Sequence, residues 1–210
     1  MPGRTSGKGQ GWTLTVVRQE NTEVAPDPGI SELNDQELVA ACLAGRAGAF
    51  DVIVERHRRS VYQLCYRFVG NHEDASDLSQ DVFLRAYRGL RNFRGQSSLG
   101  TWLYRIGVNV CLNRVSIKRP ANEPIDEHRH VDTRNESPVD GVLRTERAAR
   151  VRAAVAQLPR KQRAALVLRI YHELSHQEIA DIVGSSVGAV KANVFHALQN
   201  LKKLIDEDLV

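Results

Sequence analysis

The stretch FRGQSSLGTWLYRIGVNVCLNRVSIKR, residues 93–119, decides how the rest of the chain is interpreted. Its first part, from Arg94 to Gly100, is a polar Gly/Ser loop that follows neither helical nor strand periodicity. The remainder has helical spacing, and its apolar side consists of Trp102, Leu103, Ile106, Val110 and Leu112. Thr101 or Ser98 can cap the helix start, because a hydroxyl accepts from a free N–H of the first turn. Pro120 then ends the helix.

An unusual combination of side chains lies beside this loop. Trp102, Tyr104 and Arg105 share one turn, and Asn109 lies one turn further on. Aromatic rings stack on unpaired bases, Arg holds phosphates and Asn reads base edges, so the stretch is typical of nucleic-acid binding. The alternative is an ordinary amphipathic helix whose aromatic side chains pack in a core.

Composition sets limits on the function. The 210 residues suffice for one large domain or two small ones, and the net charge of +4 permits nucleic-acid binding without requiring it. No apolar run approaches the ~18–20 residues that a membrane helix needs. The N-terminus lacks an apolar signal segment, so we expect a cytoplasmic protein without membrane insertion. The three cysteines, Cys42, Cys65 and Cys111, lie far apart and resemble buried apolar residues rather than a disulfide frame or zinc site.

The sequence of the first half of the chain predicts four helices that follow a tail. Residues 1–33 are interpreted as a disordered tail, with a strand at Thr13–Val17 as a minor alternative. Asn34 or Asp35 caps a first helix, and Gly70-Asn71 ends a longer one. A third helix, Asp74–Leu90, has an outer face with acids first and bases later. This order suits the helix dipole, but it also suits docking to a basic partner. The predicted outer face carries Asp74, Asp77, Gln80, Asp81, Arg85 and Arg88.

The second half predicts a linker and another helical unit. Residues 120–140 contain three prolines and many acids, which is typical of a linker, and its His128 and His130 have no metal-ligand partner at useful spacing. We therefore expect no metal and no cofactor. Residues 141–210 are predicted to form the second unit, with helices at Val142–Leu158 and Gln162–Tyr171 before a final pair.

The final pair, residues 174–205, predicts a helix-turn-helix. Ser175 and Glu178 form a capping box, Gly184 permits a left-handed turn, and Ser185 is the predicted cap of the second helix. Ile179, Ala180 and Val183 should face inward in the first helix. The buried stripe of the second helix is Val187, Val190, Val194, Ala197 or Leu198, and Leu201. Such a second helix enters the DNA major groove, and the alternative is a plain helical hairpin. The outward residues are Ser186, Gly188, Lys191, Ala192, Phe195, His196 and Gln199.

With both halves in view, the chain resembles the extracytoplasmic-function sigma factors of bacterial RNA polymerase. Four motifs carry the resemblance: DLSQDVFLRAY (77–87), FRGQSSLGTWLYRIGVN (93–109), LPRKQRAALVLR (158–169) and LSHQEIADIVGSSVGAVK (174–191). The resemblance implies an all-α fold of two helical domains joined by a flexible linker, region 2 at 34–119 and region 4 at 141–210. It implies no enzyme activity, and it implies three partners: polymerase core, promoter DNA and an anti-sigma factor.

The resemblance also assigns residues to three interfaces. Core polymerase would bind Asp77, Gln80, Asp81 and Leu84. The downstream (-10) element would meet Arg94, Gln96, Ser97, Ser98, Trp102, Arg105 and Asn109, where a base is flipped and the duplex melts. The upstream (-35) element would meet Ser186, Gly188, Lys191, Ala192, Phe195 and His196.

The chain departs from the family pattern at Gly100, where many members have a bulkier residue. It also departs at Asn193 and His196, where basic residues are frequent. Two other classes remain open: a dimeric helix-turn-helix regulator, and an RNA-binding or protein-interaction bundle. The first of these needs neither the 93–109 stretch nor an acidic docking face.

Overall fold

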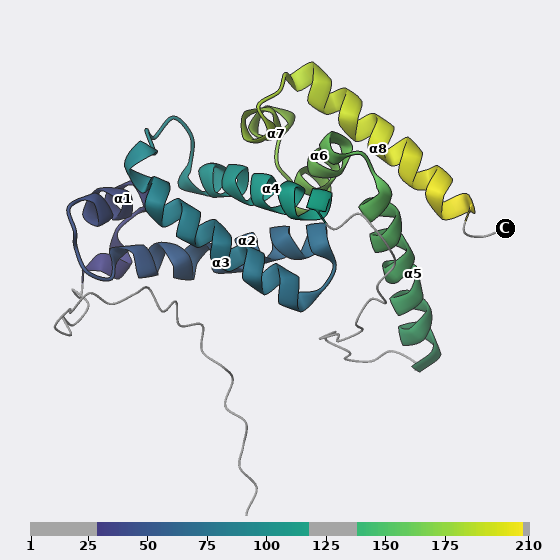
Figure 1. Ribbon diagram of the computed structural model, residues 1–210, viewed down its shortest axis with the longest axis horizontal. Helices are drawn as coiled ribbons and strands as arrows, with labels where there is room; N and C mark the ends of the chain where they lie inside the picture. The colour runs from purple at the N-terminus through teal and green to yellow at the C-terminus, as the bar shows by residue number, and fades with distance from the viewer. Residues whose placement is uncertain (1–28, 118–137, 208–210) are drawn as a thin grey trace, which may run out of the picture.

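The computed structural model describes residues 29–117 and 138–207, which form two helical units (Figure 1). No β-strand occurs in these residues, so the prediction of an all-α fold with two helical domains is confirmed. Predictions for the 1–28 tail, Lys118 to Pro120, His128, His130 and most of the linker lie outside the described residues. The first unit consists of η1 (Ile30–Glu32), α1 (Asp35–Leu43), α2 (Ala49–Val69), α3 (His72–Gly89), η2 (Leu90–Asn92) and α4 (Leu99–Ile117). The second consists of α5 (Pro138–Gln157), α6 (Arg160–Tyr171), α7 (His176–Val183) and α8 (Val187–Glu207).

Side-chain caps and glycines set the helix boundaries of the first unit. Asn34 caps α1 and forms a reciprocal capping box with Glu37. Gly70, at a φ of 80°, ends α2 in the left-handed conformation that glycine adopts without strain. The Asn71 side chain accepts from the Asp74 N–H and so caps α3. As a result α3 begins at His72, two residues before the predicted start.

Two predicted boundaries differ from the structure. The tail was expected to run to residue 33, but Ile30 is only 2% exposed and belongs to the core. Arg56 Nη2 also donates to the Ser31 carbonyl at 2.8 Å, which fixes this segment on α2. Helix α5 begins at Pro138, within the predicted linker, because proline suits the first turn of a helix, where its missing N–H has no partner to lose.

The core of the first unit lies where α4 packs across α2 and α3. Leu64 and Phe68 of α2, Val82 of α3 and Leu103 of α4 are each at most 1% exposed. Gly107 of α4 faces α2 so closely that a methyl group added there would lie 2.7 Å from Leu64 Cδ2. The two helices therefore approach each other through a position that has no side chain.

We expect Gly107→Ala to destabilise the protein. The extra methyl would overpack a filled core, which costs roughly 1–3 kcal/mol, because Cδ2 of the fully buried Leu64 would have to shift away from it. This loss should exceed the gain of about 1 kcal/mol in helix propensity from glycine to alanine. Thermal unfolding measures the effect.

Gly100→Ala is the matched control on the same helix, since the added methyl would make an ordinary contact of 3.7 Å with His57. This control should keep or raise the melting temperature. A Gly107→Ala protein as stable as the wild type would show that α2 and α4 can separate at little cost.

The second unit folds around the predicted helix-turn-helix. The Ser175–Glu178 capping box and the left-handed Gly184 (φ 63°) are both present. One detail was wrong: Ser186, not Ser185, supplies the cap of α8 by accepting from the Ala189 N–H at 3.2 Å. Val183 packs against the core as predicted, and Ile182 is buried as well. In α8 the buried stripe runs through Ala197, and Leu198 is 48% exposed.

The two units pack against each other through α6 and α7 of the second and α2 and α4 of the first (Figure 1). Arg163 of α6, only 5% exposed, donates to the Phe68 carbonyl near the end of α2. This position suits a cation, because the last carbonyls of a helix carry partial negative charge. The two helical domains therefore pack against each other within the described residues.

Candidate functional site

The outer face of α3 presents the residues that were expected to bind a protein partner. Asp77 and Gln80 are exposed, Leu84 is 37% exposed, and the Asp81 side chain is 41% exposed. Arg85 lies one turn beyond Asp81 and donates to its carboxylate at 3.0 Å. Asp81 therefore already has a cationic partner on its own helix, and any docking cation must compete with Arg85.

Two residues near this face differ from what the sequence predicted for them. Asp74 is part of the fold, because its carboxylate accepts from Arg114 of α4 at 3.0 Å and from the Asn71 side chain. Tyr87 was not predicted, yet it is 55% exposed and meets Phe50 edge-on at 5.0 Å between ring centres. Its helical spacing after Leu84 was the signal that could have identified it. An exposed apolar patch thus adjoins the acidic residues.

The polar loop before α4 is exposed, as its composition suggested. Arg94, Gln96 and Ser98 lie on the surface, and Ser97 is partly covered. The Ser98 hydroxyl accepts from the Thr101 N–H at 3.0 Å, so Ser98 is the N-terminal cap. The loop is thereby anchored at the helix start while most of its side chains face solvent.

Trp102 is half-buried. Its ring packs 5.3 Å from that of Phe93 and lies against Gly89 at the end of α3. Part of this side chain therefore supports the base of the loop, as the core-packing alternative expected. The remaining part is accessible.

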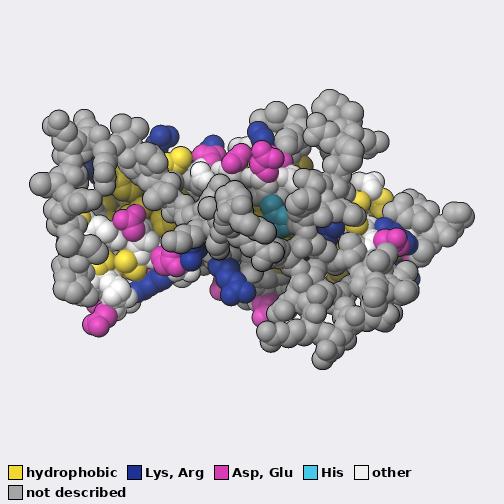
Figure 2. Space-filling view, turned by 90° about the horizontal axis from the view of Figure 1, so that it is seen from below, with side chains coloured by type: hydrophobic (Ala, Val, Ile, Leu, Met, Phe, Trp, Pro, Cys, Tyr) yellow, Lys and Arg dark blue, Asp and Glu magenta, His cyan; other side chains and the backbone are white. Residues whose placement is uncertain are grey.

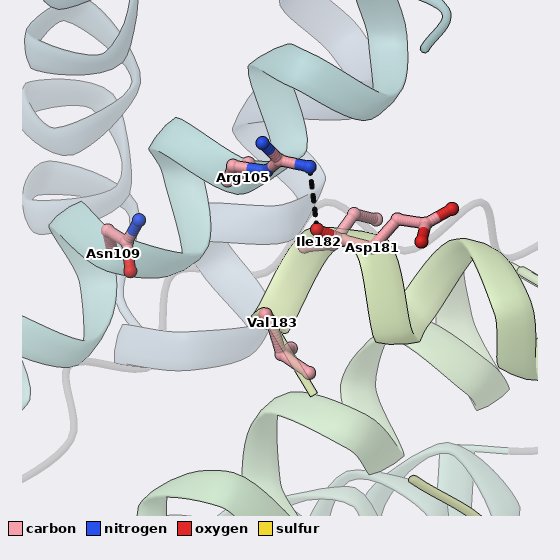
Figure 3. A pocket seen from close by; sticks show the side chains of 6 residues that line it. Arg105, Asn109, Asp181, Ile182 and Val183 are labelled. Atoms are coloured by element: carbon pink, nitrogen blue, oxygen red, sulfur yellow. Dashed lines mark hydrogen bonds between the residues drawn. The ribbon is translucent and has the colours of Figure 1, made fainter. Parts of the chain in front are cut away.

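Arg105 and Asn109 meet the second unit. Arg105 Nη2 donates to the Asp181 carbonyl of α7 at 2.7 Å (Figure 3). Both residues are exposed on α4 and open onto a pocket of about 300 Å³ between the units. The pocket is lined by Arg105, Asn109, Asp181, Ile182, Val183 and Gly184.

The outward face of α8 is uncovered. All six residues assigned to the upstream element are exposed, and Phe195 stands out at 58%. The His196 ring meets Phe195 edge-on at 5.6 Å. An exposed aromatic pair on a helix whose opposite side is buried is a feature that a binding partner would cover.

Charges of both signs lie close together on the face shown in Figure 2. Among the described residues visible there, Asp and Glu side chains lie beside Lys and Arg.

An aromatic contact also joins the two units. The Tyr104 hydroxyl of α4 lies 3.0 Å from His172 Nδ1, at the end of α6, and the rings meet edge-on. Burial, with a smaller contribution from the nearby Arg67 charge, lowers the pKa of His172 to about 4. The histidine is therefore neutral at physiological pH.

The cysteines have no role in these faces. Cys65 and Cys111 are fully buried, and a hydrogen bond to Cys65 together with burial raises the pKa of the Cys111 thiol.

None of the helices in residues 29–117 and 138–207 has the length and apolar character to cross a membrane.

Comparison with known proteins gives matches over both units. The family model for Sigma-70 region 2 matches residues 53–119, and that for Sigma-70, region 4 matches residues 148–201. The chain is 35% identical to the RNA polymerase sigma-H factor of Pseudomonas aeruginosa, over 84% of this chain and 96% of that protein. It is 32% identical to the ECF RNA polymerase sigma factor SigW of Bacillus subtilis, over 76% of this chain and 90% of that protein.

Among solved structures, CnrH in complex with the cytosolic domain of CnrY aligns with a TM-score of 0.63 at 28% identity. The alignment covers 83% of this chain and 98% of CnrH.

Proposed function

Because the chain belongs to the extracytoplasmic-function (ECF) family of RNA polymerase sigma factors, we propose which of its surfaces carry each step of transcription initiation. As a sigma factor it is not an enzyme; it binds core polymerase and promoter DNA, and it directs promoter recognition and melting. The assignment of these tasks to individual residues is our proposal.

The outer face of α3 is the proposed core-binding surface. Asp77, Gln80 and Asp81 supply acceptors for basic groups, and Leu84 with Tyr87 supplies the apolar contact that the centre of an interface needs. The observation that supports this assignment is the exposure of these side chains on a helix whose other side is buried.

The loop and α4 are the proposed site of promoter melting. Flipping a base out of the duplex costs a few kcal/mol of stacking, which a pocket and an aromatic platform can recover. Arg94, Gln96, Ser97 and Ser98 would hold the flipped base of the -10 element, and Trp102, Arg105 and Asn109 would lie at the melting fork.

The outward face of α8 is the proposed reader of the -35 element. The single observation that carries the proposal is that all six assigned residues are exposed, on the second helix of a complete helix-turn-helix or at its N-terminal cap. They are Ser186, Gly188, Lys191, Ala192, Phe195 and His196.

We also propose a cytoplasmic location, where polymerase and DNA are found, and restraint by an anti-sigma factor. The support for a protein partner is the CnrH structure, which was solved with the cytosolic domain of CnrY. Run-off transcription with core enzyme over a library of genomic promoters tests the proposed function. Promoter-specific starts that require the chain would support it, and uniform initiation with or without the chain would reject it.

We expect Phe195→Ala to relax base preference at one position of the -35 element. A ring that covers a thymine methyl contributes on the order of 1–3 kcal/mol at that base pair and little elsewhere. Selection of preferred duplexes by the full protein with core enzyme measures the preference. Leu198→Ala is the matched control, because Leu198 is similarly exposed but lies further from the N-terminal end of α8.

Lys191→Ala provides the contrasting pattern. If Lys191 contacts only phosphate, its loss should weaken all sequences alike and reduce the salt dependence of binding by about one ion. If the Phe195→Ala protein kept the base preference of the wild type, Phe195 would not belong to the surface that reads the -35 element.

A further inference from the structure

His57 of α2 lies beside the start of α4, next to the loop that we assign to the flipped base. Its ring packs against Gly100, where an added methyl group would lie 3.7 Å from His57 Cε1. The His57 side chain is only 17% exposed, so its neighbours restrict its position. In Figure 1, α1 and the loop before α4 lie at the same end of the first unit. None of the surfaces proposed for polymerase or DNA includes this histidine.

Asp35 of α1 fixes the orientation of the imidazole ring. Asp35 Oδ2 lies 2.9 Å from His57 Nε2, and Asp35 Oδ1 accepts from Arg56 Nη1 at 3.3 Å. A carboxylate can only accept hydrogen bonds, so Nε2 is the nitrogen that donates. In the neutral ring the other nitrogen, Nδ1, is then an acceptor, because the partner of one ring nitrogen sets the role of the other.

His57 Nδ1 borders an open space at the start of α4. The position of a methyl group added to Gly100 lies 3.9 Å from Nδ1 and also 3.9 Å from Ser98 Oγ. Among the described residues, Nδ1 has no hydrogen-bond partner. These distances are ordinary van der Waals contacts, so the space accepts one methyl-sized group without displacing its neighbours. The space is open because residue 100 is a glycine, and any side chain there would occupy it.

A small space beside a fixed acceptor suits a small hydrogen-bond donor. The exocyclic amino groups of adenine and cytosine are methyl-sized donors, whereas guanine and thymine carry an acceptor oxygen at the corresponding edge. Enzymes that take a base out of the duplex read it through hydrogen bonds to this kind of edge. The chemistry at His57 Nδ1 therefore favours an amino base over a keto base.

We propose that His57, oriented by Asp35 and left uncovered by Gly100, determines which base is flipped from the -10 element, and that it selects adenine or cytosine through their amino group. The inference rests on the proposed function, because it takes Ser98 and its loop as the site of the flipped base. A purely structural histidine, which only joins α1 to α2 through Nε2, would be indifferent to the identity of that base.

Base analogues that lack only the amino group test this selection. In promoter templates, each adenine of the non-template -10 strand is replaced in turn by purine, and each cytosine by 2-pyrimidinone. Open-complex formation by the full protein with core enzyme is followed by permanganate reactivity of unpaired thymines. For the wild type we expect one position where the natural base is preferred to its analogue by roughly 2- to 12-fold, the net worth of one hydrogen bond.

His57→Phe keeps an aromatic ring in place and removes Nδ1, so the preference at that position should fall to nearly one. The matched control is His72→Phe, the same change on an exposed histidine at the start of α3, the opposite end of that helix from the loop. This control should keep the preference of the wild type. Asp35→Asn should give an intermediate value, because an amide can either donate or accept and no longer fixes Nδ1 as the acceptor.

Gly100→Ala separates recognition from folding. Its methyl group fills the space beside Nδ1 at ordinary contact distances, while His57 and Asp35 are unchanged. As argued above, this variant should be at least as stable as the wild type. We nevertheless expect it to lose the preference for the amino base.

Three results would overturn the inference while the proposed function stands. The first is a His57→Phe protein that melts natural and analogue templates with the same ratio as the wild type, even if it melts both less. The second is a Gly100→Ala protein that keeps the preference. The third is a wild type that melts promoters but shows no position sensitive to loss of an amino group. If the wild type formed no promoter-specific open complexes at all, the proposed function would fail, and the inference with it.

Discussion

Asp81→Arg is expected to weaken binding to core polymerase by about 2–5 kcal/mol, or roughly 30- to 3,000-fold. The substitution removes a carboxylate that a basic group on the core would contact, and it leaves that group facing a like charge. It also removes the partner of Arg85 on the same helix. The helical fold should survive, because Asp81 lies on the outer face of α3. Titration against fluorescently labelled core enzyme, with circular dichroism of the variant, measures both effects.

Arg85→Ala is the matched control for this prediction. It breaks the same ion pair within α3 but keeps the carboxylate, whose competing cation is removed. A surface pair of this kind contributes only about 0.3–0.5 kcal/mol to the helix, so stability should hardly change. Core affinity should be equal to that of the wild type or greater. Equal losses in Asp81→Arg and Arg85→Ala would mean that the pair itself, and not the carboxylate, matters for docking.

Local sequence patterns predicted the helices and turns well because the interactions that set them are local. The capping boxes at Asn34 and Ser175 and the left-handed Gly184 depend on residues within three or four positions, and all three are present. The predictions failed at positions where two neighbouring residues, or two neighbouring helices, fit the same pattern equally well. Ser185 and Ser186 are adjacent and chemically equal, and Asn71 could either end one helix or begin the next. Helical periodicity likewise left Ala197 and Leu198 open.

The sequence predicted the exposed face of α8 better than it predicted the contacts between the two units. Periodicity placed the α8 residues outward, and their exposure agrees with that prediction. Contacts between the two units could not be predicted, because the hydrogen bonds among them join residues 47 to 95 positions apart and leave no periodic signal. Arg163 illustrates the difficulty: in the run LPRKQR it resembles its exposed neighbours Arg160 and Lys161, yet it is buried against α2.

Trp102→Ala is expected to reduce open-complex formation while closed-complex binding stays nearly unchanged. Stacking of an unpaired base on an aromatic ring contributes on the order of 1–3 kcal/mol, so the open fraction should fall roughly 5- to 150-fold at limiting conditions. Permanganate reactivity of unpaired thymines measures the open complex, and protection of the -35 element measures the closed one.

The half-buried position of Trp102 makes a second variant necessary, because truncation also removes its packing on Phe93 and Gly89. Trp102→Phe keeps a ring in that contact and presents a smaller stacking surface. If the ring supports the melted strand, melting should decrease in the order wild type, Phe, Ala, in a protein whose Phe variant unfolds near the wild-type temperature. If the side chain serves only the loop base, the Ala variant should lose thermal stability and still open the promoter once folded. Trp102 would then belong with the core, and recognition of the melted strand would fall to the loop side chains and to Arg105, which donates to the Asp181 carbonyl of α7.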